Sequence, residues 1–183
     1  EREDPIDGKE GKFRFLINGV EIMCKGSNWV PMDAFHSRDA ERYDAALALF
    51  KDIGCNIIRC WGGNVYEDHK FFDFCDRNGI MVWQEFPLAC NEYPDDEDYL
   101  SVLEKEATAI IRRLRTHPCL VLWCGGNELF NNWSKMTDQH HALRLLDSVC
   151  YLEDKDTPFI MTSPLNGMAH GHYMNYDEET GQE

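Results

Sequence analysis

The sequence lacks long apolar runs and is poor in basic residues. No stretch of about 18 consecutive apolar residues occurs, so we expect no membrane-spanning helix and no membrane partner. Lysine and arginine together number 18 against 33 aspartate and glutamate residues, which gives a formal net charge of -15. A protein of this charge repels phosphate groups, so we expect no nucleic acid partner.

Recurrent metal-binding and disulfide motifs are also missing. The eight cysteines form no C-x-x-C motif, and no pair among the seven histidines has ligand spacing. Most cysteines lie inside apolar runs, such as the CNIIRC segment at residues 55–60. This pattern favours buried free thiols over a disulfide framework or a zinc site. We therefore expect no metal and no cofactor.

The start of the chain differs in character from the rest. Residues 1–11 are charged and polar and lack the apolar segment of a signal peptide. We interpret them as a linker from a preceding domain and residues 12–183 as part of one catalytic domain. The sequence is compatible with a periplasmic, secreted, lysosomal or cytoplasmic compartment.

Strand and helix patterns alternate along the chain. The Asn18-Gly19 pair, typical of a type I′ turn, predicts a hairpin of residues 13–17 and 20–25, whose second strand leads to Ser27-Asn28-Trp29. Further short apolar segments predict strands at 55–60, 80–83, 120–123 and 158–162. Helical periodicity lies between them, at 38–53, 67–78, 100–114 and 138–152. Ser37 is the expected N-cap of the first helix and Gly54 its stop.

This alternation indicates a parallel sheet covered by helices, either doubly wound or a (β/α)8 barrel. The segment after the first strand, residues 26–31, is GSNWVP and contains no glycine-rich phosphate loop. The strands instead end in polar and aromatic residues, where a barrel assembles its site. We predict a (β/α)8 TIM barrel. Five strands do not close a barrel, so we expect its first half, either as an excised fragment or with its open edges covered by another copy.

The pair Asn127-Glu128 follows the fourth sheet strand and is the main candidate for catalysis. A glycosidase needs a carboxylic acid that protonates the departing glycosidic oxygen, and a neighbouring amide can bind a sugar hydroxyl. The alternative interpretation is a helix cap with an exposed acid. The five tryptophans, all in or beside strand ends and loops, favour the sugar site because aromatic faces stack on sugar rings; they are Trp29, Trp61, Trp83, Trp123 and Trp133.

Two further features refine the candidate site. Trp61, before Gly62-Gly63, is the best candidate for the pocket wall, whereas Trp83 and Trp123 are equally compatible with a core position. Arg59 lies within an apolar strand, where an unpaired charge is costly, so we expect it to meet Glu85 or Glu128. That pair is either structural or sets the pKa of the acid. The candidate substrate-binding residues are Asn28, Trp29, Arg59, Trp61, Glu85, Asn127 and Trp133.

Five segments resemble the catalytic barrel of glycoside hydrolase family 2, and most closely its β-mannosidases. They are residues 17–35, 56–67, 71–86, 112–128 and 158–167. The resemblance implies a retaining exo-hydrolase that removes terminal β-linked mannose. It also implies that Glu128 is the acid/base, that Asn127 binds the 2-hydroxyl group, and that Trp61 forms a pocket wall. The family nucleophile is a glutamate on a later strand, beyond residue 183, so we expect the isolated chain to be inactive.

The sequence departs from the family pattern at three positions. Glu85 stands where the family has aspartate, Gly126 where it has asparagine, and Asn64 where it has a third glycine. These departures leave β-galactosidase, β-glucuronidase and exo-β-glucosaminidase activities as alternatives. Two other hypotheses are a non-catalytic carbohydrate-binding module and, more weakly, a metal-dependent hydrolase that uses His170 and His172.

Overall fold

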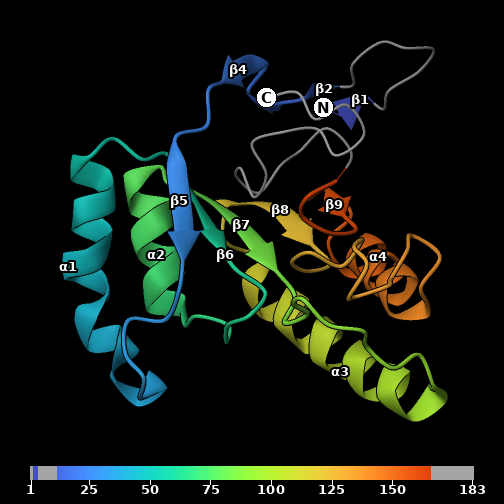
Figure 1. The fold of residues 1–183 in the computed structure, drawn as a ribbon. Helices are drawn as coiled ribbons and strands as arrows, with labels where there is room; N and C mark the ends of the chain where they lie inside the picture. Colours follow the sequence, from blue (N-terminus) through green and yellow to red (C-terminus); the bar gives the residue numbers. More distant parts are fainter. Residues whose placement is uncertain (1, 4–11, 166–183) are drawn as a thin grey trace, which may run out of the picture.

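A five-stranded parallel sheet forms the centre of the computed structural model, which describes residues 2–3 and 12–165. The strands are β5 (Gly26–Trp29), β6 (Ile57–Cys60), β7 (Met81–Glu85), β8 (Leu120–Cys124) and β9 (Phe159–Ile160), and they pair in that order (Figure 1). The helices between them are α1 (Asp39–Asp52), α2 (His69–Asn78), α3 (Glu97–Leu114) and α4 (His141–Glu153). Among the described residues, no helix combines the length and apolar character that a membrane span requires.

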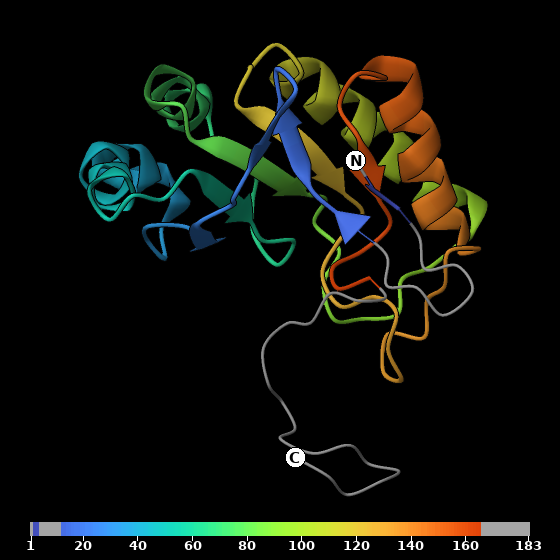
Figure 2. The same cartoon turned by 90° about the horizontal axis from the view of Figure 1, so that it is seen from above.

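The strand order distinguishes the two architectures expected from the sequence. Each strand of the sheet pairs with the next one along the chain, and α1 to α4 lie along one side of the curved sheet (Figure 2). A doubly wound fold reverses its strand order and has helices on both faces. Sequential order with helices on the outer side is instead the winding of a (β/α)8 barrel, and the described residues form an open part of it.

The hairpin forms with the predicted turn but with shorter strands. β3 (Phe15–Ile17) pairs antiparallel with β4 (Val20–Ile22), and Asn18 and Gly19 have φ values of 51° and 79°, as a type I′ turn requires. The stretch that follows does not continue the strand, because the Asn56 side chain accepts from Lys25 N and donates to Met23 O. The first strand of the parallel sheet is therefore β5, separate from the hairpin.

A second short pairing precedes the hairpin. β1 (Arg2–Glu3) pairs antiparallel with β2 (Lys12–Phe13). β1 falls within the segment expected as a linker, and the rest of that segment lies outside the described residues. This pairing connects β1, at the start of the described chain, to β2, which leads into the hairpin.

Helix ends follow local chemistry, with one exception. Asp68 and Asp96 cap α2 and α3 by accepting hydrogen bonds from Lys70 N and Tyr99 N, and Gly79 ends α2 with a φ of 66°. The prediction for Ser37 was wrong. A 3-10 turn, η1 (His36–Arg38), occupies that position, and α1 begins after Arg38 without a side-chain cap.

The apolar side chains form two layers on opposite faces of the sheet. The larger layer lies between the sheet and the helices and contains the buried apolar residues of α1, α2, α3 and α4. The smaller contains Leu122, Cys124 and Ile160, with Phe15 of the hairpin and Trp83 packed against it. The smaller layer lies on the face that forms the interior in a closed barrel.

Phe71 tests the larger layer. Its side chain is fully buried and its ring lies against Trp29, Tyr43 and Phe72. We predict that Phe71→Ala lowers the free energy of unfolding by about 3–5 kcal/mol, measured by urea denaturation. The matched control is Phe35→Ala, because Phe35 is 67% exposed. Equal effects of the two substitutions would contradict the layer assignment.

Candidate active site

Polar side chains gather on the inner face of the sheet, toward the carboxyl ends of the strands. The parallel register places Asn28 beside Arg59 and Arg59 beside Trp83. A cavity of about 870 Å³ lies between this face and the hairpin. Asn28, Arg59 and Trp83 are among its lining residues, whereas Glu85, Asn127 and Glu128 are not. The inner face of three neighbouring strands therefore contributes to one site.

Arg59 is the centre of this site. Its Nε and Nη2 atoms lie 2.8 and 2.7 Å from Glu85 Oε1, so the carboxylate partner expected for Arg59 is Glu85. Nη1 donates to Asn28 Oδ1 at 3.0 Å, and Nη2 donates to Asn127 Oδ1 at 2.6 Å. The guanidinium also lies over the ring of Trp83, 5.5 Å from its centroid. One cation thus connects side chains from four consecutive strand ends.

Glu85 is held on both carboxylate oxygens. Its side chain is fully buried; Arg59 binds Oε1, and Gly62 N donates to Oε2 at 2.8 Å. Burial raises the pKa of Glu85, and the nearby Arg59 charge and the Gly62 hydrogen bond lower it, with a net rise. A Cβ at position 62 would lie 2.7 Å from two backbone oxygens, so glycine permits this close approach.

The backbone of Asn127 pairs with the loop after β7 on one side and with the loop after β9 on the other. Asn127 N donates to Leu88 O, and Cys90 N donates to Asn127 O, both at 2.9 Å. On the other side Asn127 forms a parallel bridge with Ser163. The preceding Gly126 has a φ of 155°, and a Cβ there would lie 2.3 Å from Leu88 O. The amide side chain of Asn127 is therefore buried in a defined position.

Glu128 is held in a left-handed backbone conformation, with a φ of 51°. Its backbone N donates to Ser163 O at 2.7 Å, and its carbonyl accepts from Asn131 Nδ2 and Ser134 Oγ at 2.6 and 2.8 Å. Surrounding hydrogen bonds must maintain such a backbone, and it is common at functional sites. The next helix begins at His141, so the helix-cap interpretation of this pair is wrong.

Cys90 is a member of the site that the sequence did not reveal. Asn127 Nδ2 donates to Cys90 Sγ at 3.0 Å, and the Cys90 thiol donates to Glu128 Oε2 at 3.5 Å. Its partners lie 37 and 38 residues away in the chain. No local pattern indicates such a contact, because it depends on how the loops after β7 and β8 meet.

The tryptophans divide between the two faces of the sheet. Trp29 is buried on the helix side, where its Nε1 donates to Glu67 Oε1 at 2.8 Å, so its predicted role in substrate binding was wrong. Successive strand residues face opposite sides of the sheet, so Asn28, which precedes Trp29, faces the inner side. Trp123 also fills the outer core, stacked on Phe86, whereas Trp83 lies on the inner face.

Trp61 and Trp133 lie in the loops after β6 and β8. Trp61 follows β6 directly and is partly buried. Its ring lies over Gly63, where an added Cβ would come within 2.1 Å of it. Trp133 is 61% exposed in the loop after β8. Their roles in substrate binding stay predictions.

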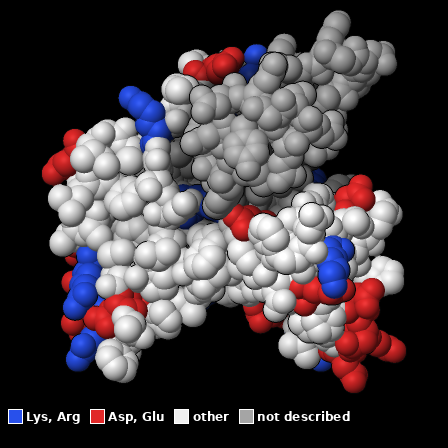
Figure 3. Space-filling view, in the orientation of Figure 1, with Lys and Arg blue, Asp and Glu red and all other residues white. Residues whose placement is uncertain are grey.

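Acidic residues gather in the loop after β7 and at the start of α3. In Figure 3 the acidic atoms concentrate at the lower right, over the N-terminal end of α3. The loop after β7 and the start of α3 contain the exposed residues Glu92, Asp95, Asp96, Glu97 and Asp98. Loops that follow strands lie at the carboxyl ends of the sheet, so these charges lie on the same side of the sheet as Asn127 and Glu128.

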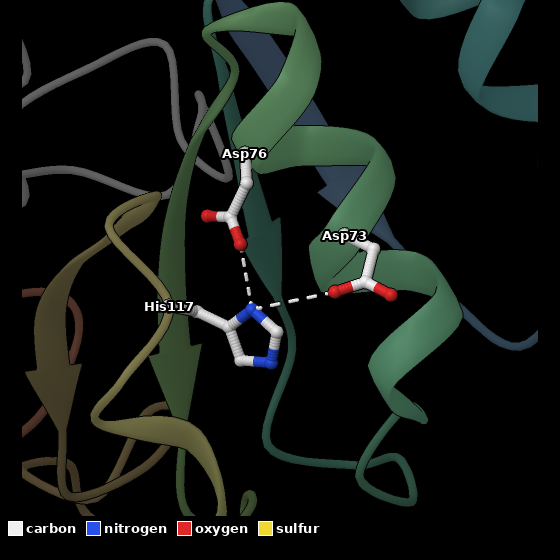
Figure 4. A group of neighbouring side chains, drawn as sticks. All are labelled: Asp73, Asp76 and His117. Carbon is white, nitrogen blue, oxygen red and sulfur yellow. Dashed lines mark hydrogen bonds and ion pairs between the residues drawn. The ribbon is translucent and has the colours of Figure 1, made fainter.

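A separate polar cluster lies on the outer side, between α2 and the start of β8 (Figure 4). His117 Nδ1 lies 2.6 Å from Asp76 Oδ2 and 3.9 Å from Asp73 Oδ1. Asp76 Oδ1 accepts from Cys119 N at 2.8 Å. In the described part of the chain, these three side chains are the one group whose ligand atoms fit around a metal ion. The hydrogen bonds connect α2 to β8, which is a structural role.

His170 and His172, considered above for a metal-dependent hydrolase, lie outside the described residues.

The fold and the site define a part of a (β/α)8 barrel with paired carboxyl and amide groups at its strand ends. The chain matches the family "Glycosyl hydrolases family 2, TIM barrel domain" over residues 9–176. It therefore belongs to glycosyl hydrolase family 2, as the sequence motifs indicated.

Individual relatives agree with this assignment. The chain is 38% identical over 181 residues to a beta-mannosidase of Capra hircus, covering 90% of this chain and 21% of the relative. It is 45% identical over 122 residues to beta-mannosidase B of Aspergillus fumigatus, covering 66% and 14%. The chain thus spans about a fifth or less of the length of these curated relatives.

Solved structures share the fold. The beta-D-mannosidase of Dictyoglomus thermophilum superimposes with a TM-score of 0.81 at 38% identity, covering 89% of this chain and 21% of that one. The beta-glucuronidase of Parabacteroides merdae gives a TM-score of 0.67 at 22% identity, covering 80% and 19%. At that identity the second likeness shows the fold alone.

Arg59→Met tests the central ion pair. The substitution leaves the Glu85 carboxyl buried without its cation, so we predict a loss of about 3–5 kcal/mol in the free energy of unfolding near neutral pH. The pKa of Glu85 is higher in the folded than in the unfolded protein. The free energy of unfolding therefore falls as pH rises from the unfolded pKa through the folded one. The Arg59→Met variant should steepen that fall. Urea unfolding across a pH series measures both effects. Arg77→Met, at an exposed position on α2, is the control. Identical pH profiles for wild type and Arg59→Met would contradict this account.

Asp76→Asn tests the outer cluster. Burial raises the pKa of Asp76, but hydrogen bonds from Cys119 and His117 lower it overall. A lowered folded pKa stabilises the protein above the unfolded pKa, and the stabilisation is lost as pH falls through the folded pKa. We predict a loss of about 1–3 kcal/mol at neutral pH that shrinks in acid, measured by urea unfolding. Asp73→Asn, 51% exposed and more distant from His117, should cost less than about 1 kcal/mol. A loss independent of pH would disprove the ionic role of Asp76.

Proposed function

We propose that this chain supplies the acid/base half of the active site of a retaining exo-β-mannosidase, with a carbohydrate as its partner. The observation that carries the proposal is the position of Asn127 and Glu128 at the end of β8, with Asn127 bonded to Arg59 at 2.6 Å. The relatives named beta-mannosidase at 38–45% identity support the sugar assignment.

Asn127 has a defined orientation for a sugar hydroxyl. The arginine guanidinium carries donors and no acceptor, so the oxygen of the Asn127 amide must face Arg59. The NH2 group then points to the other side, toward Cys90. In the proposed complex, this NH2 group of Asn127 binds the 2-hydroxyl group of the sugar. Strengthening of that hydrogen bond in the transition state lowers the barrier.

Glu128 acts as the acid and then as the base. In the first step its carboxylic acid protonates the departing glycosidic oxygen while a second carboxylate attacks the anomeric carbon. In the second step its carboxylate takes a proton from the water that hydrolyses the glycosyl-enzyme. The hydrogen bonds that hold the backbone of Glu128 support this role, because the acid must be aimed at one oxygen.

The second carboxylate is proposed to come from a later strand of the barrel. A retaining mechanism places the two carboxyl groups about 5–5.5 Å apart. Glu85 is a poor nucleophile, because Arg59 and Gly62 N bind its two oxygens. We therefore expect residues 1–183 alone to be inactive. The outer edges of β5 and β9 are positioned to pair with further barrel strands, or with another copy of the chain where those strands are missing.

The charges around the site favour a neutral sugar. A glucuronide would bring its carboxylate toward the acidic loop after β7, and Arg59 is already paired with Glu85. These features disfavour a β-glucuronidase. The same acidic loop attracts a cationic amino sugar, so exo-β-glucosaminidase activity is the second candidate.

Glu128→Gln in the full-length protein that contains this chain tests the function. We predict that the wild-type full-length protein hydrolyses an aryl β-mannoside in preference to the corresponding β-galactoside, β-glucuronide and β-glucosaminide. The substitution should lower kcat/KM by about 10²–10⁴-fold, because general acid-base catalysis contributes that much. Azide, which needs no base, should restore turnover. Glu92→Gln, which removes an exposed acid nearby, should change activity little.

The outcomes separate the hypotheses. Preference for the β-glucosaminide would select the second candidate. Sugar binding without hydrolysis of any aryl glycoside would support a non-catalytic binding module and overturn the proposed enzyme. Wild-type rates in Glu128→Gln would overturn the role of Glu128.

A further inference from the structure

Cys90 differs from the other thiols of the chain in its surroundings. It is the exposed one of the eight cysteines, whereas five are buried and two are half-buried. It lies in the loop after β7 with a φ of 49°, a left-handed conformation that is uncommon for this residue type. The other cysteines have no contact with the Asn127 or Glu128 side chain among the hydrogen bonds of the described residues.

The backbone around Cys90 is held from two sides. Cys90 N donates to Asn127 O, and Ala89 forms a parallel bridge with Asn127. Tyr93 closes the loop, because its hydroxyl accepts from Ala89 N at 2.7 Å. The loop thus presents the Cys90 side chain to the end of β8 in one position.

The thiol connects two functional groups at once. A thiol has one proton to donate and a sulfur that accepts weakly, so it can accept from Asn127 Nδ2 while it donates to Glu128 Oε2. Burial raises the pKa of Cys90; Asn127 lowers it and the Glu128 carboxylate raises it, with a net rise. The thiol therefore keeps its proton at neutral pH and can act as the donor to Glu128.

We propose that Cys90 is a positioning residue that holds the Asn127 amide and the Glu128 carboxyl in one hydrogen-bonded unit at the sugar site. This inference rests on the proposed function of Glu128 as the acid/base. A donor to a carboxylate favours its charged form, so the thiol also influences the pH at which Glu128 gives up its proton. Cys90 itself exchanges no proton or bond with the substrate.

The contact can be tested without any activity, by alkylation with iodoacetamide across a pH series. Trypsin releases residues 78–105 as a peptide in which Cys90 is the sole cysteine, so mass spectrometry follows this thiol alone. Glu128→Gln removes a negative charge beside the thiol and should move the midpoint of alkylation to lower pH. Glu92→Gln removes an equal charge from an exposed position two residues away and should leave the midpoint nearly unchanged. Equal midpoints in Glu128→Gln and wild type would overturn the contact.

The effect on catalysis is tested in the full-length protein with Cys90→Ala and Cys90→Ser. We expect Cys90→Ala to lower kcat/KM by about tenfold, the effect of one lost hydrogen bond to a charged group. It should also move the alkaline limb of the pH profile of kcat/KM to higher pH, because the charged form of Glu128 loses a donor. Cys90→Ser keeps a donor and should recover part of both effects. Cys55→Ala, at a half-buried thiol before β6, is the control.

The two proposals fail in different ways. If the wild type hydrolyses no aryl glycoside, the proposed function fails, and the alkylation result still decides the contact. If Cys90→Ala folds and keeps the wild-type pH profile, the thiol has no positioning role although the enzyme assignment stands. A rate loss without a profile shift would also overturn the proposal, since a packing role alone produces that result.

Discussion

The hydrogen-bonded ion pair of Arg59 and Glu85 is the interaction on which the site depends. A buried pair of this kind is stable only when further hydrogen bonds satisfy both ions. Here Glu85 has Arg59 and Gly62 N as partners, and Arg59 also binds Asn28 and Asn127. The geometry of each bond restricts the others. The ends of β5, β6, β7 and β8 are thereby held in one arrangement, and the orientation of the Asn127 amide follows from it.

The backbone after β8 adds a second constraint. Gly126 permits close approach to the loop after β7, and Glu128 adopts a conformation that its neighbours must maintain. Hydrogen bonds from Asn131 and Ser134 hold the Glu128 carbonyl. Groups that are already oriented need little reorganisation during a reaction, which is the main physical source of catalytic efficiency in preorganised sites. The strained backbone at position 128 is thus held by hydrogen bonds on both its amide and its carbonyl.

The two faces of the sheet differ in the residues that they bear. Trp29, Trp123 and the buried helix residues form the outer core, which stabilises the sheet. The inner face bears Asn28, Arg59 and Trp83 and borders the cavity. Because neighbouring positions on a strand face opposite sides, one residue of a strand packs while the next belongs to the site.

The sequence by itself determined the features that depend on local chemistry. Apolar periodicity placed the helices and strands, Asn18-Gly19 marked a turn, and the cost of an unpaired buried charge predicted a carboxylate beside Arg59. The family motifs placed Glu128 at a strand end. The tertiary structure decided that Asn56 ends the hairpin early, that Trp29 faces the helices, and that Cys90 lies between Asn127 and Glu128. These features depend on pairing register and on contacts between distant loops, and neither has a signal in a short stretch of sequence.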